Sequence, residues 1–168
     1  MRVRRATIGD VQAVVDIAQK VVPLMQGAGN FQWDDTYPTK EHFLVDVENS
    51  HLWVVTDTAG IVIGFGALTT AQPEEYAQSG CDLSKPSIVP HRMAVDPSAQ
   101  RSGAARLLFD KSEELAREMG YEFVRVDTNT CNVAMQRLIL KSGFSMKGEI
   151  SLVGESGSLR YFCYEKSI

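Results

Sequence analysis

One stretch constrains the fold of this chain more than any other: a strand that runs into a small, basic, glycine-containing loop and then a helix. The apolar run at 87–95 predicts the strand, and the Asp-Pro pair at 96–97 predicts a turn after it. The loop is QRSGAAR over 100–106, and apolar residues then recur at helical spacing. A further apolar run at 123–127 predicts another strand. Strand, helix and strand in this order predict a parallel pair inside a mixed sheet.

Hydrophobic periodicity predicts the remaining elements on both sides of this unit. Strands are expected at 3–7, 52–56, 61–69, 145–152 and 159–165, and helices at 10–23 or one turn longer, 39–47 and 132–143. Residues 70–86 are polar, contain two prolines and a glycine, and favour a mobile loop. Because no linker, repeat or low-complexity segment divides the chain, we expect one domain over 1–168. The expected fold class is α/β (α+β), with four helices and a mixed, mostly antiparallel sheet of about seven strands in the order β-α-α-β-β-β-α-β-α-β-β.

Composition and charge disfavour several classes of protein. With a net charge of −4, the chain lacks the basic surface that non-specific nucleic-acid binding requires, and no apolar run approaches the roughly 20 residues of a membrane span. The N-terminal segment has no apolar region of the signal-peptide type. Cys81, Cys131 and Cys163 lack C-x-x-C spacing and form no metal-ligand pattern with the histidines. We therefore expect a cytoplasmic protein with reduced thiols, no metal, no membrane and no nucleic-acid partner.

The loop at 100–106 has the features of a phosphate-binding site. A helix N-terminus offers unpaired N–H groups and a positive dipole end. The residues at 102–105 are small enough to let a ligand reach the backbone, and an arginine stands on each side. The alternative is a tight strand-to-helix turn that simply requires small residues. A P-loop is disfavoured because G-x-x-x-x-G-K-[ST] is absent, and a Rossmann site because the glycines at 64 and 66 lie inside an apolar strand without a third glycine.

Residues 100–105 also resemble the Q/R-x-x-G-x-G/A loop of the GNAT superfamily of N-acetyltransferases, and MAVDP at 93–97 is similar to its preceding strand and turn. The residues that match the superfamily's N-x5-L-x2-K-x-G-F ending are Asn132, Leu138, Lys141, Gly143 and Phe144. These motifs stand in the superfamily's order, and the expected strand order fits the whole chain. The chain also resembles a group of small bacterial members, whose substrates are mostly unassigned. The residues that carry this resemblance are Trp33, Tyr37-Pro38, His91-Arg92, Asp127-Thr128 and Met135-Gln136.

The resemblance implies that acetyl-CoA is the cofactor and acyl donor, and that CoA is the product. The pantetheine arm would lie where the strands at 87–95 and 123–128 splay into a V, and would pair with strand backbone. The pyrophosphate would lie on N–H groups of the loop, and the asparagine of the last motif would contact the arm. The implied cofactor-binding residues are Met93, Ala94, Val95, Arg101, Ser102, Gly103, Ala104, Ala105, Arg106 and Asn132.

Acyl transfer to an amine requires a base for the amine proton, a donor for the oxyanion and a proton for the leaving thiolate. The resemblance makes Asp127 a candidate base, because some members carry a glutamate at that position. His91 is the other candidate, because a histidine titrates near neutral pH. A capping carboxylate and a locally bonded strand histidine are the structural alternatives. A backbone N–H near Met93 or Ala94 is the candidate oxyanion donor.

One position departs from the resemblance. The superfamily often carries a tyrosine, the general acid for the thiolate, directly after the leucine of its last motif, and this chain has Ile139 there. A thiol with a pKa near 8.5 can leave without it. Other tyrosines could substitute, namely Tyr121, Tyr161 and Tyr164. The departure keeps a second function open, a non-catalytic acyl-CoA-binding sensor or interaction domain of the same fold.

The acceptor is expected near the first two helices and the 70–86 segment. Trp33, Tyr37 and Tyr76 are the candidate substrate-binding residues, and with the carboxylates at 74–75 they would suit a cationic amine. The structural alternative is that Trp33 covers an edge of the core and that the loop is solvated. The resemblance implies an amine of a small molecule, peptide or protein as the acceptor, and a homodimer is a further expectation.

Overall fold

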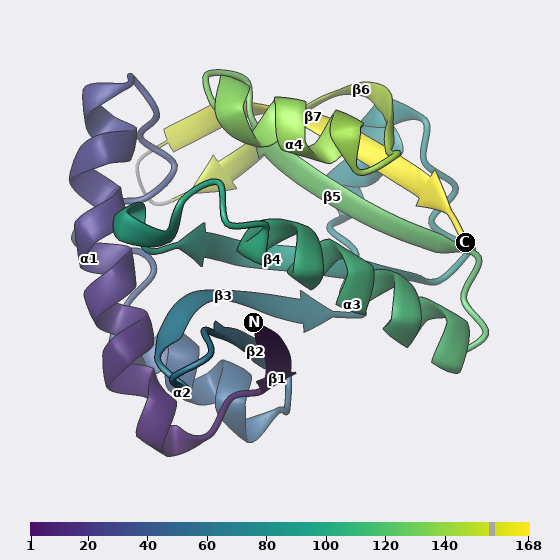
Figure 1. The fold of residues 1–168 in the computed structure, drawn as a ribbon. Helices are drawn as coiled ribbons and strands as arrows, with labels where there is room; N and C mark the ends of the chain where they lie inside the picture. Colours follow the sequence, from purple (N-terminus) through teal and green to yellow (C-terminus); the bar gives the residue numbers. More distant parts are fainter. Residues whose placement is uncertain (155–156) are drawn as a thin grey trace. The chain divides into compact units, whose positions relative to one another are not determined.

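The strands and helices follow the predicted pattern closely (Figure 1). The computed structural model describes residues 1–154 and 157–168. Its strands are β1 (Arg2–Arg5), β2 (Leu52–Thr56), β3 (Val62–Thr69), β4 (Ser87–Val95), β5 (Phe123–Asn129), β6 (Ser145–Gly154) and β7 (Gly157–Ser167). Its α-helices are α1 (Val11–Gly27), α2 (Lys40–Glu48), α3 (Ala104–Glu118) and α4 (Val133–Lys141). Short 3-10 helices are η1 (Ile8–Asp10), η2 (Glu74–Ser79) and η3 (Pro97–Ala99).

The strands form a mixed sheet in the order β1-β2-β3-β4-β5-β7-β6. β4 and β5 pair in parallel, with Ser87 beside Phe123 and Ile88 beside Val124. The pairs β1–β2, β2–β3, β5–β7 and β6–β7 are antiparallel. The predicted mixed sheet with a parallel pair joined through a helix is therefore confirmed. No described helix combines the length and the apolarity that a membrane crossing needs.

The chain divides into two compact units. Unit 1 consists of Met1–Thr69 and Pro90–Lys111, and unit 2 consists of Thr70–Val89 and Ser112–Ile168. Each unit has its own buried apolar cluster. Two of the boundaries between the units fall inside β4 and inside α3.

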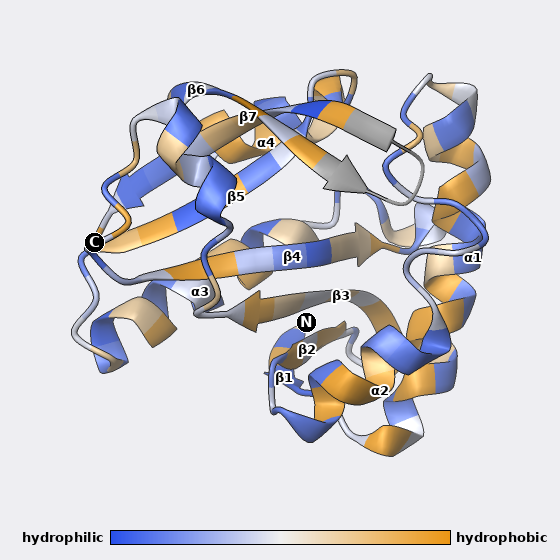
Figure 2. Cartoon of the chain, turned by 180° about the vertical axis from the view of Figure 1, so that it is seen from behind, coloured by the Kyte–Doolittle hydropathy of each residue, from blue (hydrophilic) through white to orange (hydrophobic). Residues whose placement is uncertain are grey.

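Unit 1 is built around the apolar face of α1. The buried positions of this helix are Val11, Val14, Ile17, Ala18 and Val22. Their spacing follows the helical repeat, and Figure 2 shows apolar and polar residues alternating along α1 as this spacing requires. They join a cluster with Trp33, Phe43, Leu52, Val54, Phe65 and Ala94. The helix continues through the exposed Pro23 to Gly27, the longer of its two predicted ends.

Two glycines of β3 allow a close approach to β4. A Cβ at Gly64 would lie 3.1 Å from the carbonyl oxygen of Ala94, and a Cβ at Gly66 would lie 2.9 Å from Cγ of Met93. A side chain at Gly64 would press on the backbone of β4, and one at Gly66 would force the side chain of Met93 to shift. The Gly-Phe-Gly run is therefore a packing feature of the sheet, which agrees with the rejection of a dinucleotide site.

The segment 70–86 differs from its predicted character as a mobile loop. It contains η2, and it buries Tyr76, Ser79 and Cys81 in unit 2. The cluster that Tyr76 and Cys81 join consists otherwise of Val89, Ile150, Tyr161 and Cys163. A Cβ at Gly148 of β6 would lie only 3.1 Å from Cα of Ser79, so the segment packs directly on that strand. Polarity and prolines misled the prediction because the few buried residues are scattered among exposed ones.

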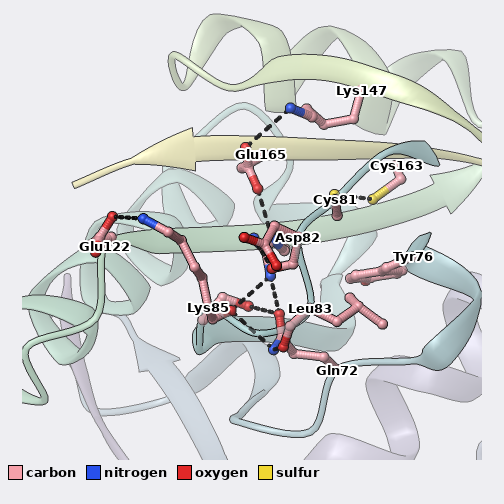
Figure 3. A network of polar contacts seen from close by, with 12 residues as sticks. Gln72, Tyr76, Cys81, Asp82, Leu83, Lys85, Glu122, Lys147, Cys163 and Glu165 are labelled. Atoms are coloured by element: carbon pink, nitrogen blue, oxygen red, sulfur yellow. Dashed lines mark hydrogen bonds and ion pairs between the residues drawn. The ribbon is translucent and has the colours of Figure 1, made fainter. Parts of the chain in front are cut away.

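A buried arginine of β5 holds this segment. Arg125 is 1% exposed, and its Nε donates to Glu165 of β7 at 2.8 Å. Its two Nη atoms donate to the carbonyl oxygen of Lys85 at 3.0 Å, to the carbonyl oxygen of Asp82 at 3.1 Å and to Oε1 of Gln72. Figure 3 shows these four partners converging in one network. The burial of this charge is tolerated because a carboxylate and several acceptors compensate it.

Candidate functional site

The loop between β4 and α3 is held in unit 1 by a carboxylate. Oδ1 of Asp96 accepts from the backbone N–H and the hydroxyl of Ser98 at 2.9 and 2.6 Å, and this bonding begins η3. Lys20 of α1 donates to Oδ2 at 2.8 Å. The hydrogen bond from Lys20, followed by those from Ser98, lowers the pKa of Asp96 to about 2. The start of the loop is therefore tied to α1.

The second half of the loop has an unusual backbone. Arg101 and Gly103 have φ angles of 62° and 93°, in the left-handed region. Glycine adopts this region freely, whereas an arginine there stores about 1 kcal/mol of strain or more. Left-handed residues in a turn can direct successive N–H groups into a concavity that suits an anion. Among the described residues, a Cβ at Gly103 would meet within 4 Å only Cε of Met1, at 3.9 Å, so the space over this glycine is open.

The helix α3 begins directly after the loop. The N–H of Ala104 donates to Oγ of Ser102 at 3.3 Å, and the N–H of Leu107 donates to the carbonyl oxygen of Gly103 at 3.1 Å. Nε of Arg106 donates to Asp110 at 2.7 Å, so a carboxylate on the helix shares this charge. Small residues, a helix N-terminus and open space fit the pyrophosphate group that the sequence predicts here.

The strand β4 carries the residues predicted to hold the pantetheine arm. Met93 and Val95 are half-buried, and Ala94 is buried. Arg92, which directly precedes them, has a φ of 46°, a backbone conformation that residues other than glycine rarely adopt. The backbone is therefore irregular where the arm is expected. His91, a candidate base, is half-buried on the same strand.

A polar cluster that the sequence analysis missed lies at Tyr37. Nε and Nη2 of Arg92 donate to the carboxylate of Asp46 on α2, and Nη1 donates to the hydroxyl oxygen of Tyr37 at 3.2 Å. The sequence contains a signal for it, because Asp46 stands between Phe43 and Val47 on the apolar side of the predicted helix. A carboxylate on a buried face needs a partner. Periodicity cannot say which residue supplies it.

The two candidate aromatics of unit 1 differ in exposure. Trp33 is 3% exposed and stacks on Phe65, with 6.4 Å between the ring centroids, so it belongs to the core. Tyr37 is half-buried, lies edge-on to His42 with 5.1 Å between ring centroids, and is held at its hydroxyl. Trp33 thus has the packing role that was its structural alternative, and Tyr37 has the exposure that contact with an acceptor requires.

In unit 2 the structure brings together two predicted site residues, Tyr76 and Asp127. The hydroxyl of Tyr76 donates to Oδ1 of Asp127 at 2.5 Å. Tyr76 is fully buried, and Asp127 is half-buried on β5. Burial, and then the charge of Asp127, raise the pKa of Tyr76 well above its ordinary value. Tyr76 is therefore a protonated, buried donor, which is a correction to its predicted role as an aromatic surface for the acceptor.

Two buried thiols belong to the same cluster as Tyr76. Sγ of Cys81 and Sγ of Cys163 are 3.9 Å apart (Figure 3), far beyond the roughly 2.05 Å of a disulfide bond. Oγ of Ser79 lies 3.4 Å from Sγ of Cys81. Burial raises the pKa of Cys163 to about 12, so this thiol is not a nucleophile near neutral pH.

The last motif forms the beginning and the interior of α4. Asn132 caps the helix as predicted, with Oδ1 accepting from the N–H of Met135 at 3.2 Å. Ile139, at the position of the superfamily's usual acid, is fully buried. Cys131, beside the cap, is exposed. Over the part of the chain that the structure describes, no three side chains of the metal-ligating types gather as a metal site.

Comparison with known proteins identifies the fold. The model of the acetyltransferase (GNAT) family matches residues 17–144. A GNAT-family acetyltransferase from Streptococcus agalactiae has a TM-score of 0.80 at 21% identity, over 99% of this chain and 95% of that one. A ribosomal-protein-alanine N-acetyltransferase from Brucella melitensis has a TM-score of 0.72 at 21% identity, over 100% of both chains. A putative acetyltransferase from Salmonella typhimurium, determined with acetyl-CoA, has a TM-score of 0.72 at 19% identity, over 99% of this chain and 93% of that one. None of the curated proteins matches the chain.

Proposed function

Because the chain belongs to the acetyltransferase (GNAT) family, we propose that it moves an acetyl group from acetyl-CoA to an amine of a small molecule, peptide or protein. The observation that carries this proposal is the loop at 101–106, with two left-handed residues, open space over Gly103 and a helix N-terminus behind it. Among the similar structures, the Salmonella protein contains acetyl-CoA, and the Brucella protein is named for an amine acceptor. Both therefore support the reaction class.

The proposed cofactor site uses backbone groups more than side chains. The N–H groups of residues 101–106 would bind the pyrophosphate, and the backbone of Met93, Ala94 and Val95 would pair with the pantetheine arm. The side-chain amide of Asn132 would contact the arm as well. Acetyl-CoA supplies the acetyl group as a thioester, and CoA is the product. No metal is part of the proposal.

Proton transfer from the acceptor falls to the chain's own residues. A carboxylate oxygen of Asp127 or the imidazole of His91 would accept the proton of the amine. A backbone N–H near Met93 or Ala94 would stabilise the oxyanion. Tyr37, held at its hydroxyl by Arg92, would contact the acceptor.

Cofactor binding tests the loop. We expect acetyl-CoA to raise the melting temperature of the wild-type protein, and Gly103→Glu to abolish that rise by filling the open space with a repelling charge. Gly60→Glu is the matched control, because Gly60 is exposed, has a φ of 86° and has open space around it. The control should lose similar stability and keep the response to acetyl-CoA. Equal responses of the two variants would show that the loop is misassigned.

Turnover separates the enzyme from the alternative, a non-catalytic acyl-CoA sensor. The enzyme should release CoA thiol when acetyl-CoA is supplied with a panel of small amines, amino acids and peptides. Stabilisation by acetyl-CoA without turnover across the panel would favour the sensor. No stabilisation at millimolar acetyl-CoA would exclude both.

The pH dependence of turnover identifies the base. If Asp127 takes the proton, Asp127→Asn should remove the acid limb of the profile, and His91→Ala should retain it. The reverse result would assign the base to His91. If a variant keeps the wild-type pH profile, the residue that it replaces is not the general base.

A further inference from the structure

We propose that Tyr76 is a positioning residue, which holds the carboxylate of Asp127 in the orientation that accepts the proton of the acceptor amine. This inference rests on the proposed function and deepens it. It also assigns a role to a segment, 70–86, that the polar composition suggested was a mobile loop.

The contact itself is short and buried. The hydroxyl of Tyr76 lies 2.5 Å from Oδ1 of Asp127, and the tyrosine side chain has no solvent exposure. Hydrogen bonds to an ionised group are shorter and about twice as strong as neutral ones. Asp127 has its main-chain position set by β5, where it lies opposite Cys163 of β7. The strand backbone and this buried donor both restrict the direction of the carboxylate plane.

The donor does not change its protonation state over any practical assay range. Burial and the neighbouring charge raise the pKa of Tyr76 well above its ordinary value. The other titratable groups that act on it are the thiols of Cys81 and Cys163, and burial raises the pKa of Cys163 to about 12. The cluster therefore keeps one proton on the tyrosine at neutral pH, and Tyr76 always donates to the carboxylate.

Tyr76 is itself held in place on both sides. Within η2, Oγ of Ser79 donates to the carbonyl oxygen of Tyr76 at 2.8 Å. Further along the segment, Arg125 binds the carbonyl oxygens of Asp82 and Lys85. Arg125 and Asp127 are two residues apart on β5, so their side chains extend from the same face of the strand. Arg125 of β5 thus anchors the 70–86 segment, and Asp127 of the same strand accepts the hydrogen bond from Tyr76.

This arrangement predicts more than stability. Removing a hydrogen-bond donor makes a carboxylate hold its proton more tightly, and it weakens the restraint on the orientation of the group. In Tyr76→Phe we therefore expect kcat to fall by about tenfold to a hundredfold. We expect the acid limb of the pH–rate profile to move to higher pH, while the KM for acetyl-CoA and the stabilisation by acetyl-CoA stay near wild type.

A double-mutant cycle tests the coupling. Tyr76→Phe in the background of Asp127→Asn should cause little further loss of kcat, because the carboxylate that Tyr76 orients is already absent. Ser79→Ala, which removes a bond that holds Tyr76, should change kcat in the same direction by a smaller factor. This second variant keeps the test available if Tyr76→Phe folds poorly. Asp82→Asn is the control, because it alters an exposed carboxylate of the same segment, and it should keep wild-type kcat and profile.

Two results would overturn the inference. If Tyr76→Phe lowers the melting temperature but retains the wild-type kcat and pH profile, the tyrosine is only structural. If the losses of Tyr76→Phe and Asp127→Asn multiply, the two residues act independently. Either result leaves acetyl transfer by the wild-type protein intact. An absence of acetyl-CoA-dependent turnover in the wild type would instead overturn the proposed function and this inference together.

Discussion

Arg92 and Asp46 form a bidentate ion pair, in which Nε and Nη2 of the guanidinium donate to the two carboxylate oxygens at 2.9 and 2.7 Å. The side chains are 18% and 5% exposed, so both charges are largely removed from water. The pair joins α2 to the irregular position of β4, where Arg92 has a positive φ. The strain at that residue is compatible with a stable fold because the paired guanidinium is held from two directions.

Breaking this pair should destabilise the protein strongly. Arg92→Met keeps most of the apolar stem but leaves the carboxylate of Asp46 buried without its main partner. We expect the free energy of unfolding to fall by about 3 kcal/mol, measured by urea denaturation. The exposed pair of Lys85 and Glu122 is the comparison, and Glu122→Gln should leave the free energy of unfolding close to that of the wild type. Equal losses in the free energy of unfolding in the two variants would mean that the buried pair stabilises the protein no more than the exposed pair.

The stability contributed by Asp96 should depend on pH in the acid range. Its pKa is about 2 in the folded protein and about 3.9 in an unfolded chain, so its contribution is complete above about pH 4 and is lost as the pH falls through about 2. Asp96→Asn should therefore unfold more easily than wild type at pH 7, and the difference should vanish near pH 2. Chemical denaturation at pH 7, 4 and 2 measures this. A difference that is constant with pH would show that the charge on Asp96 is irrelevant.

The three thiols should differ sharply in reactivity. Cys131 is exposed, whereas Cys81 and Cys163 are buried, and the pKa of Cys163 is about 12. In the native protein a thiol reagent at pH 7 to 8 should modify Cys131 quickly and the buried pair only after denaturation. Mass spectrometry of the labelled protein identifies the sites, and Cys131→Ser should abolish the rapid phase. Rapid native labelling of Cys163 would contradict the burial of this cluster.

The 70–86 segment should depend on Arg125. Arg125→Met leaves Glu165 and the carbonyl oxygens of Asp82 and Lys85 without their shared donor, so the free energy of unfolding should fall by about 3 to 5 kcal/mol. Limited proteolysis at a temperature where the variant is folded should then cut within 70–86. Arg117→Met is the control, because Arg117 forms an i,i+4 pair on the surface of α3. Resistance of 70–86 in Arg125→Met would show that other contacts hold the segment.

Local patterns were sufficient for most elements of this fold. The spacing of Val11, Val14 and Ala18 predicted α1 because the helical repeat puts these residues on one face, and they are buried there. The cap at Asn132 and the turn at Asp96 were predicted for the same reason, since each is an interaction within four residues. The loop at 100–106 was recognised from its order of small and basic residues, whereas the left-handed backbone at Arg101 was not.

The sequence by itself determined the order of strands and helices, the family resemblance and the loop that opens α3, because all of these depend on neighbours along the chain. Only the tertiary structure decided which polar residues pair. Asp46 with Arg92 and Tyr76 with Asp127 are separated by 46 and 51 residues, respectively. No local pattern specifies such partners, since a buried charge or hydroxyl requires only some complementary group. Which group it finds depends on how the elements pack, and this choice turned Tyr76 from a predicted surface aromatic into a buried donor for a candidate base.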